Sequence, residues 1–239
     1  MKYFGEGLSE LHKELAKELS GAIKKPDEIE RVKALFLELH SKLHLSEISK
    51  TEPNEVDNLL ADLSDGEYRI MPTAKDETIA WALWHLARIE DVTMSFLVSE
   101  EDQIFNLEWK RSLNATIEDT GNALTDDEIM NLSEMFDVNA LLAYRNAVGK
   151  RTQEIVKSLS AIDLKRRVTP QAIERIKQAG GVTTHKDSLW LLEYWSKKDV
   201  AGLLLMPPTR HAIMHLNDCS NWKQQIRSGK KCYRSGQSS

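Results

Sequence analysis

The chain has 239 residues, of which 41% are hydrophobic and 29% charged, a composition typical of a folded globular protein rather than a disordered one. Its formal net charge of −5 argues against a surface dominated by nucleic-acid binding. No apolar run approaches the roughly 18 residues of a membrane-spanning helix, and the N-terminus lacks the basic-then-apolar order of a signal peptide. Only two cysteines occur, so we expect a cytoplasmic protein without a disulfide framework. The net charge and the short apolar runs predict that it binds neither nucleic acid nor membrane.

Apolar residues recur at helical spacing in nearly every segment, and strand-like clusters of Val and Thr are absent, so the sequence predicts an all-α protein. The first helix is expected over about 7–24, where Pro26 ends it. Asp27, with Glu30 three residues later, predicts a capping box for a long second helix over about 28–47.

In the middle of the chain, segments rich in turn-forming residues alternate with strongly helical segments. Residues 49–75 predict a long ordered connection with a brief helical turn over 56–63. The sequence at 73–76 resembles a capping box for a third long helix over 76–98, which is apolar almost all round. Such a helix is expected to be buried on several sides. A polar stretch then leads to a further long helix over 138–159.

The next segments are shorter. Pro170 is expected to open a small helix over 171–178, which the glycines at 180–181 close. An aromatic block follows at 189–195.

Two prolines, at 207–208, are expected to end whatever helix precedes them, and Thr209 to cap a final helix over 210–227. The polar remainder, 228–239, predicts a flexible tail. Four long helices with such connections predict a four-helix bundle with long crossovers, and 1–227 is expected to form a single domain because no flexible linker divides it.

Seven histidines occur, and two pairs are spaced four residues apart: His40 with His44, and His211 with His215. Residues four apart lie on one face of a helix, so both imidazoles of a pair can bind one metal ion. His85 is the candidate third ligand, because an unpaired polar ring in its nearly apolar helix would be costly. The alternative is that these histidines pack in the core with carbonyl or carboxylate partners.

Several other residues are candidates for the lining of a pocket. His40 and His44 are expected to line the same cavity or to pack, with ligation of the metal as a third alternative. Trp84 and Trp195 are candidates for an apolar wall, although tryptophans at helical spacing commonly pack in a core. Arg88, one turn after His85, is a candidate for holding an anionic substrate, or else for pairing with a neighbouring carboxylate.

Two motifs together resemble the DinB-like superfamily, a helical family related to bacillithiol and mycothiol transferases. They are the buried run 79–91 and the run 211–216 on the last helix. In that family one histidine of the second bundle helix, and two positions four apart on the fourth, hold a divalent metal. The resemblance therefore implies His85, His211 and His215 as ligands. The N-terminal helix and the aromatic insertion have no counterpart in the shortest members.

The resemblance implies one divalent metal ion, zinc or nickel, with an open fourth position that binds a low-molecular-weight thiol. It further implies a metal-dependent transferase or isomerase-like enzyme acting on a small-molecule substrate. Asp218 is a weak catalytic candidate, as a base on bound water, but it is equally explained as a charge on a solvated helix. The alternative function is a non-enzymatic bundle with a structural or vestigial metal site. Apolar bundle faces also predict a homodimer.

Overall fold

The structure is a computed structural model that describes residues 4–74, 76–229 and 231–233. Its regular elements are helices. Within these residues there is no β-sheet, and a single isolated bridge joins Arg167 to Asp199. The all-α prediction is therefore confirmed. None of the described helices combines the length and the apolar character needed to cross a membrane.

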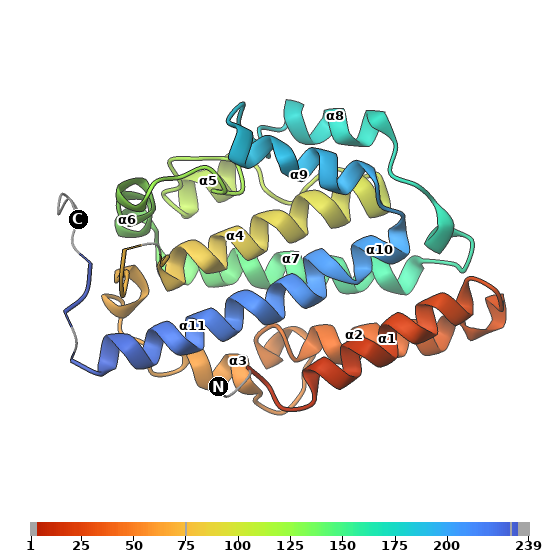
Figure 1. The fold of residues 1–239 in the computed structure, drawn as a ribbon, viewed down its shortest axis with the longest axis horizontal. Coiled ribbons are helices and arrows are strands. Elements are labelled where there is room, and N and C mark those ends of the chain that lie inside the picture. The colour runs from red at the N-terminus through yellow and green to blue at the C-terminus, as the bar shows by residue number, and fades with distance from the viewer. Residues whose placement is uncertain (1–3, 75, 230, 234–239) are drawn as a thin grey trace.

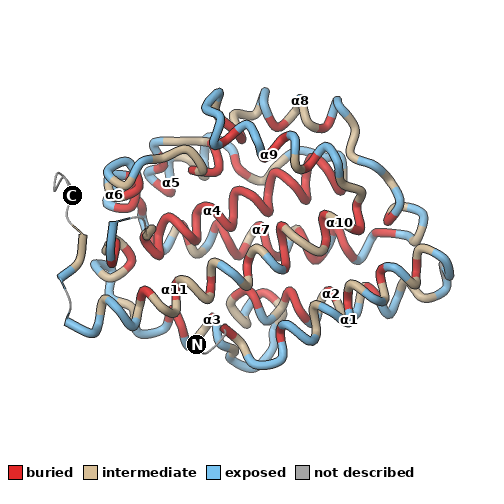
Figure 2. The backbone as a smooth tube through the Cα atoms, in the orientation of Figure 1, coloured by how far each residue is buried: buried red, intermediate tan, exposed pale blue. Residues whose placement is uncertain are grey.

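Four long helices correspond to those predicted for the bundle. They are α2 (Ile29–Ser41), α4 (Ile79–Val92), α7 (Val138–Ser158) and α11 (Ala212–Arg227). α4 packs against both α7 and α11, and α2 packs against α7 (Figure 1). Every residue of α4 is buried, as the apolar sequence predicted, and Figure 2 shows it as a continuous buried path through the molecule.

Additional helices cover the bundle on two sides. α1 (Leu8–Ala22) packs along α2 through buried leucines such as Leu15 and Leu19. On the other side lie four shorter helices: α5 (Leu107–Ser112), α6 (Asp126–Met135), α8 (Pro170–Gln178) and α9 (Lys186–Ser196) (Figure 1). The α5 and α6 helices fall in the stretch that sequence reasoning treated only as polar. The missed signal is the capping box that Thr125 and Glu128 form at the start of α6.

The remaining short elements lie in the connections. They are η1 (Pro26–Glu28), η2 (Ser46–Ile48), α3 (Glu55–Leu60), η3 (Glu67–Arg69) and η5 (Asp163–Lys165). In the predicted tail, residues 230 and 234–239 lie outside the described part of the chain, and the backbone N–H of Tyr233 donates to the carbonyl of Met71.

Two predicted helix caps are wrong. Asp27 lies within the 3₁₀ turn before α2, and no side chain caps that helix. α4 begins at Ile79 instead of residue 76, because the hydroxyl of Thr78 accepts from the N–H of Trp81. Thr73 instead donates to the carboxylate of Asp76, and Lys75 of the predicted box lies outside the described residues.

The second helix also ends earlier than predicted, at Ser41 instead of about residue 47. The side-chain amide of Asn54 donates to the carbonyls of Ser41 (3.0 Å) and His44 (2.9 Å). This distant side chain satisfies carbonyls that a longer helix would have bonded internally, so the chain turns here. His44 therefore lies just beyond α2 and not on it.

The helix before the prolines at 207–208 ends as predicted, because α10 (Val200–Leu204) stops just before them. The prolines lie in the first turn of a π-helical segment, η6 (Met206–His211), which continues directly into α11. Proline is tolerated there because the first N–H groups of a helical segment have no intrahelical acceptor. Thr209 is not a cap, because its hydroxyl donates back to the carbonyl of Leu204. α4 likewise continues as a π segment, η4 (Thr93–Ser99).

Candidate metal centre

Three histidine rings converge where α4 meets the junction of η6 and α11. The ring centroid of His85 lies 5.0 Å from that of His211 and 5.0 Å from that of His215, and the centroids of His211 and His215 lie 4.6 Å apart. The Nε2 atoms of His85 and His211 are 3.1 Å apart. One nitrogen from each ring can be chosen so that all three lie within 4.8 Å of one another. We call these three residues the triad.

The geometry of the triad fits a divalent metal ion. Two imidazole nitrogens bound to one tetrahedral ion at about 2.0–2.1 Å are separated by about 3.3 Å, close to the separation of the His85 and His211 nitrogens. Within the described residues, the Nδ1 atoms of His211 and His215 are buried and have no hydrogen-bond partner. The rings are thus held together by packing rather than by a satisfied hydrogen-bond network.

The tautomer of His85 is set by the backbone. Its Nδ1 lies 2.7 Å from the carbonyl oxygen of Thr120, which can only accept, so Nδ1 carries the proton. The lone pair of Nε2 then points toward His211 and His215. A carbonyl partner on the far nitrogen is typical of metal-binding histidines.

The segment 118–121 that supplies this carbonyl is itself held by α4. All four of its carbonyl oxygens accept hydrogen bonds from side chains of that helix. The donors are Arg88 to Glu118 (3.0 Å), Trp84 to Asp119 (3.1 Å), His85 to Thr120 (2.7 Å) and Trp81 to Gly121 (3.2 Å). The contact between this segment and α4 therefore fixes the orientation of the His85 ring.

Trp81 contacts the triad directly. Its ring stacks on His85, with centroids 4.6 Å apart and an interplanar angle of 7°, and lies edge-on to His215 at 6.0 Å. A side chain at Gly121 is excluded, because its Cβ would lie 2.7 Å from the indole nitrogen and its φ is +77°. Sequence reasoning does not single out Trp81, because tryptophans at helical spacing commonly pack in a core.

Replacing Trp81 with Phe is expected to weaken metal binding by about tenfold. The variant keeps an aromatic ring beside His85 but loses the hydrogen bond to Gly121, and the loss of such outer contacts typically costs about 10–100-fold in affinity. Competition against a chromophoric chelator measures the change. Trp190→Phe is the matched control, because Trp190 is 50% exposed on α9. Equal affinities in the two variants would show that Trp81 does not position the site.

Burial keeps the triad imidazoles uncharged. Burial, reinforced by the neighbouring His215, lowers the pKa of His85 to about 3, and burial lowers the pKa of His215 to about 4. The pKa of His211 is held well below its usual value by burial and by its two neighbours. All three rings are therefore neutral at pH 7, as metal ligands must be.

Two carboxyl groups, those of Asp218 and Glu77, interact beside α11. Asp218 follows His215 by one helical turn, and Glu77 lies just before the cap of α4. Burial, and then the charge of Asp218, raise the pKa of Glu77 to about 7. Burial and Asp76 also raise the pKa of Asp218. No hydrogen bond joins Asp218 to a triad imidazole in the part of the chain that the structure describes.

Glu77→Gln is expected to stabilise the protein above pH 7 by about 1–2 kcal/mol, after allowance for partial solvent screening. The wild-type carboxyl is harder to ionise when folded, so wild-type stability falls as pH rises from about 4.5 to about 7. Below pH 4.5 the two proteins should be equally stable. Urea unfolding at pH 4 and pH 8 checks this, and an equal difference at both pH values would contradict it.

The other pocket candidates are all buried in the core. Trp84 and Trp195 are almost completely buried. Arg88 is also buried, and each nitrogen of its guanidinium already donates a hydrogen bond, so it offers nothing to a substrate. His40 and His44 do not join the triad and lie against Glu90, between α2 and α4.

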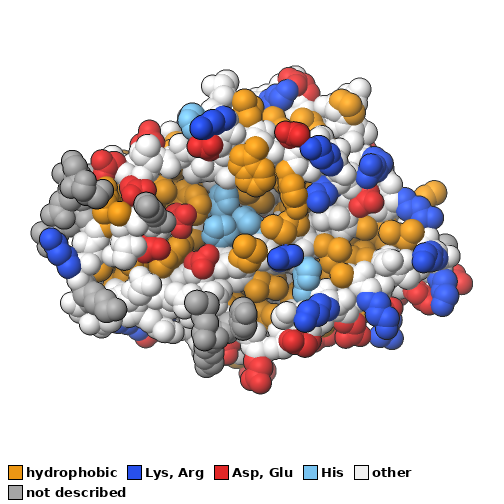
Figure 3. Space-filling view, viewed as in Figure 1, with side chains coloured by type: hydrophobic (Ala, Val, Ile, Leu, Met, Phe, Trp, Pro, Cys, Tyr) orange, Lys and Arg blue, Asp and Glu red, His pale blue; other side chains and the backbone are white. Residues whose placement is uncertain are grey.

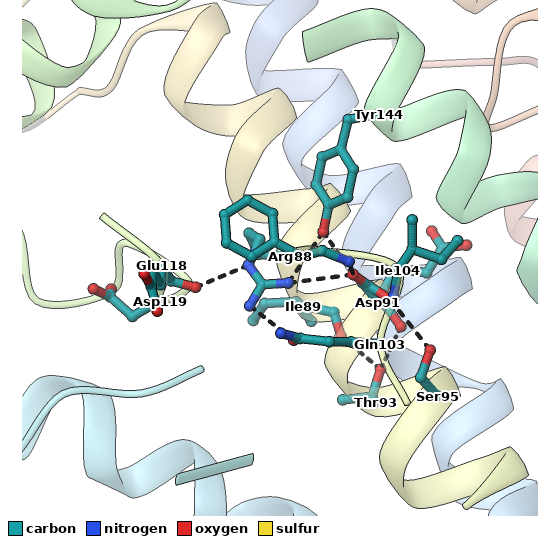
Figure 4. A network of polar contacts seen from close by, with 12 residues as sticks. Arg88, Ile89, Asp91, Thr93, Ser95, Gln103, Ile104, Glu118, Asp119 and Tyr144 are labelled. Carbon is teal, nitrogen blue, oxygen red and sulfur yellow. Dashed lines mark hydrogen bonds and ion pairs between the residues drawn. The ribbon is translucent and has the colours of Figure 1, made fainter. Parts of the chain in front are cut away.

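Arg88 instead belongs to a buried polar network centred on Asp91 (Figure 4). The carboxylate of Asp91 accepts from Arg88 (3.3 Å) and from the hydroxyl of Tyr144 (2.7 Å). It also accepts from the backbone N–H groups of Ile104 and Phe105, both at 2.9 Å. The network therefore ties α4 to α7 and to the chain that follows η4.

The triad is reachable from solvent. His211 and His215 are half-buried, whereas His85 lies beneath them and is buried. Figure 3 shows a group of histidine side chains open to solvent near the centre of one face, with hydrophobic side chains above it and acidic side chains beside it. A small molecule can therefore approach the imidazoles directly.

Comparison with known proteins gives one match. A sequence model of the DinB superfamily matches residues 50–217, which is more than half of the chain and includes all three triad histidines. No curated protein matches the chain.

Proposed function

Because the chain belongs to the DinB superfamily, we propose that it holds a divalent metal ion through His85, His211 and His215 and acts as a metal-dependent transferase of a low-molecular-weight thiol. The observation that carries the proposal is the convergence of three neutral imidazoles, with 3.1 Å between two of their nitrogens, at a solvent-facing position. Cytoplasmic location and a homodimer stay predictions.

The donor set supports a reactive site rather than a purely structural one. Three imidazoles leave a fourth tetrahedral position open, as in catalytic zinc sites, and zinc or nickel suits such ligands. When bound, such an ion supplies a Lewis acid that lowers the pKa of a thiol. His211 and His215 are half-buried, so a substrate from solution can reach the imidazoles that would hold the ion.

The thiol must come from outside the protein. Cys219 lies one turn after His215, but it is completely buried, and burial raises the pKa of its thiol well above the usual value. A thiol in that state does not ionise near neutral pH and is a poor nucleophile. The half-buried triad is instead accessible to a small thiol from solution.

Glu77 supplies a group that can take up a proton. Its pKa of about 7 matches the condition for a general base at neutral pH, where the unprotonated form is present and still basic. Asp218, on the same helix as His215, is the charge that raises this pKa after burial itself.

Thiol transfer to a chromogenic electrophile tests the proposal. Zinc- or nickel-loaded protein should accelerate the reaction of 1-chloro-2,4-dinitrobenzene with at least one of bacillithiol, glutathione, coenzyme A and cysteine. The acceleration should disappear in His85→Ala and persist in His185→Ala, because His185 is an exposed histidine at the start of α9. Bound metal without acceleration for any thiol would contradict the transferase.

A further inference from the structure

A second cluster of potential metal ligands lies in the core between α2 and α4. The Nε2 atom of His40 is 2.9 Å from one carboxylate oxygen of Glu90, and the Nε2 atom of His44 is 3.2 Å from the other. All three residues are buried, with exposed fractions of at most 3%. We propose that His40, His44 and Glu90 form a second divalent-cation site, separate from the triad and independent of the transferase function.

The chemistry of the donor set supports a cation. Two imidazoles and one carboxylate are a set that holds zinc, manganese or ferrous iron in proteins. The two histidines direct the same ring nitrogen at one carboxylate, and one ligand atom from each residue lies within 4.8 Å of the others. These three residues would supply the protein ligands of an ion held between α2 and α4.

The position of His44 is fixed by close packing against α7. A Cβ at Gly149 would lie 2.6 Å from the Nδ1 atom of His44, so this approach requires glycine. The Nδ1 atoms of His40 and His44 are both buried and have no partner among the described residues. The hydrogen bonds of the two rings run from Nε2 to the Glu90 carboxylate, so a cation that binds here displaces the Nε2 protons. For His44, Nε2 is the nitrogen left facing Glu90 and available to a cation.

The charges set the expected affinity. Burial, and then the guanidinium of Arg145, lower the pKa of His44 to about 3, which leaves its lone pair free. Although burial opposes ionisation, the adjacent imidazoles hold the pKa of Glu90 well below its usual value. The site thus offers one negative charge, but the positive charge of Arg145 also repels a cation. We expect weaker binding here than at the triad.

The competing explanation is a metal-free hydrogen-bonded cluster that clamps α2 to α4. In that arrangement both rings carry a proton on Nε2 and donate it to Glu90. The two explanations differ in the number of metal ions that the folded chain binds.

Cobalt stoichiometry distinguishes them. Metal-free protein is titrated with Co²⁺, and bound cobalt is measured by equilibrium dialysis with elemental analysis. The wild type should bind two ions, one tightly and one more weakly. Glu90→Gln keeps the shape and hydrogen-bonding capacity of the side chain, and it should bind one. The double variant His85→Ala/His211→Ala should also bind one, with the weaker affinity.

The outcomes separate this inference from the proposed function. If the wild type binds one ion, and that ion is lost in the double variant and retained in Glu90→Gln, the second site is contradicted and the triad is supported. If the wild type binds one ion, and that ion is lost in Glu90→Gln and retained in the double variant, the triad is contradicted instead. Circular dichroism confirms that each variant is folded. If a variant unfolds, the wild-type stoichiometry decides, since a single bound ion contradicts two sites.

Discussion

His211→Ala is expected to abolish stoichiometric metal binding at the triad. The variant leaves two imidazoles, and His211 is the residue whose Nε2 lies 3.1 Å from that of His85. Losing a ligand should cost more than the roughly 10–100-fold loss caused by removing a ligand's hydrogen-bond partner. Competition with a chelator, after loading with one equivalent of Zn²⁺, measures the affinity.

The same variant should also remove the stabilisation that metal gives to the fold. A metal that binds only the folded protein raises the melting temperature, and His211→Ala should lose that increase at a Zn²⁺ concentration that fills only the tighter site of the wild type. His185→Ala, at an exposed histidine, should retain it. An undiminished increase in His211→Ala would mean that zinc binds elsewhere on the protein.

Asp91→Ala is expected to destabilise the protein by about 3–5 kcal/mol, the usual cost of leaving a buried charge unpaired. Arg88 and Asp91 are both completely enclosed, with no exposed side-chain surface. The variant also removes the acceptor used by the hydroxyl of Tyr144 and by the N–H groups of Ile104 and Phe105 (Figure 4). Denaturant unfolding at constant pH measures the difference in free energy.

Asp102→Ala is the matched control for that experiment. Asp102 also pairs with an arginine, Arg175, at 2.8 Å, but its side chain is 95% exposed. Exposed pairs typically contribute about 0–1 kcal/mol, so the control should unfold close to the wild type. Similar unfolding free energies for the Asp91 and Asp102 variants would show that the buried network does not stabilise the core.

The features that sequence could predict are those encoded locally. The nearly continuous apolar run of α4 predicted a helix buried all round, and every residue from Ile79 to Val92 is buried. The spacing of His211 and His215, with the isolated polar ring of His85, identified three side chains that the fold brings together. Helical periodicity and ligand spacing each depend on a few adjacent residues, so one sequence is enough to detect them.

The features that sequence reasoning missed depend on distant parts of the chain. α2 ends at Ser41, where the amide of Asn54 bonds the carbonyls of Ser41 and His44, and the position of His44 follows from that ending. A π segment that contains Pro207 and Pro208 leads into α11 in place of the predicted Thr209 cap. Neither outcome has a signal in the neighbouring residues.

The role of Glu90 had a signal that was overlooked. Arg88, Glu90 and Asp91 are charged residues in an otherwise apolar helix, and a buried charge requires a partner. That rule predicts that partners exist, but not which ones. Identifying His40 and His44 for Glu90, and Tyr144 for Asp91, requires the packing of α2 and α7 against α4.

X-ray absorption at the zinc edge tests the triad most directly. Protein purified without a histidine tag is stripped of metal, loaded with one equivalent of Zn²⁺ and compared with His85→Ala. The wild type should show three imidazole nitrogens at about 2.0–2.1 Å and one further light-atom ligand. His85→Ala should lose that shell. A wild-type spectrum without imidazole scattering, or one that His85→Ala leaves unchanged, would contradict metal binding by the triad.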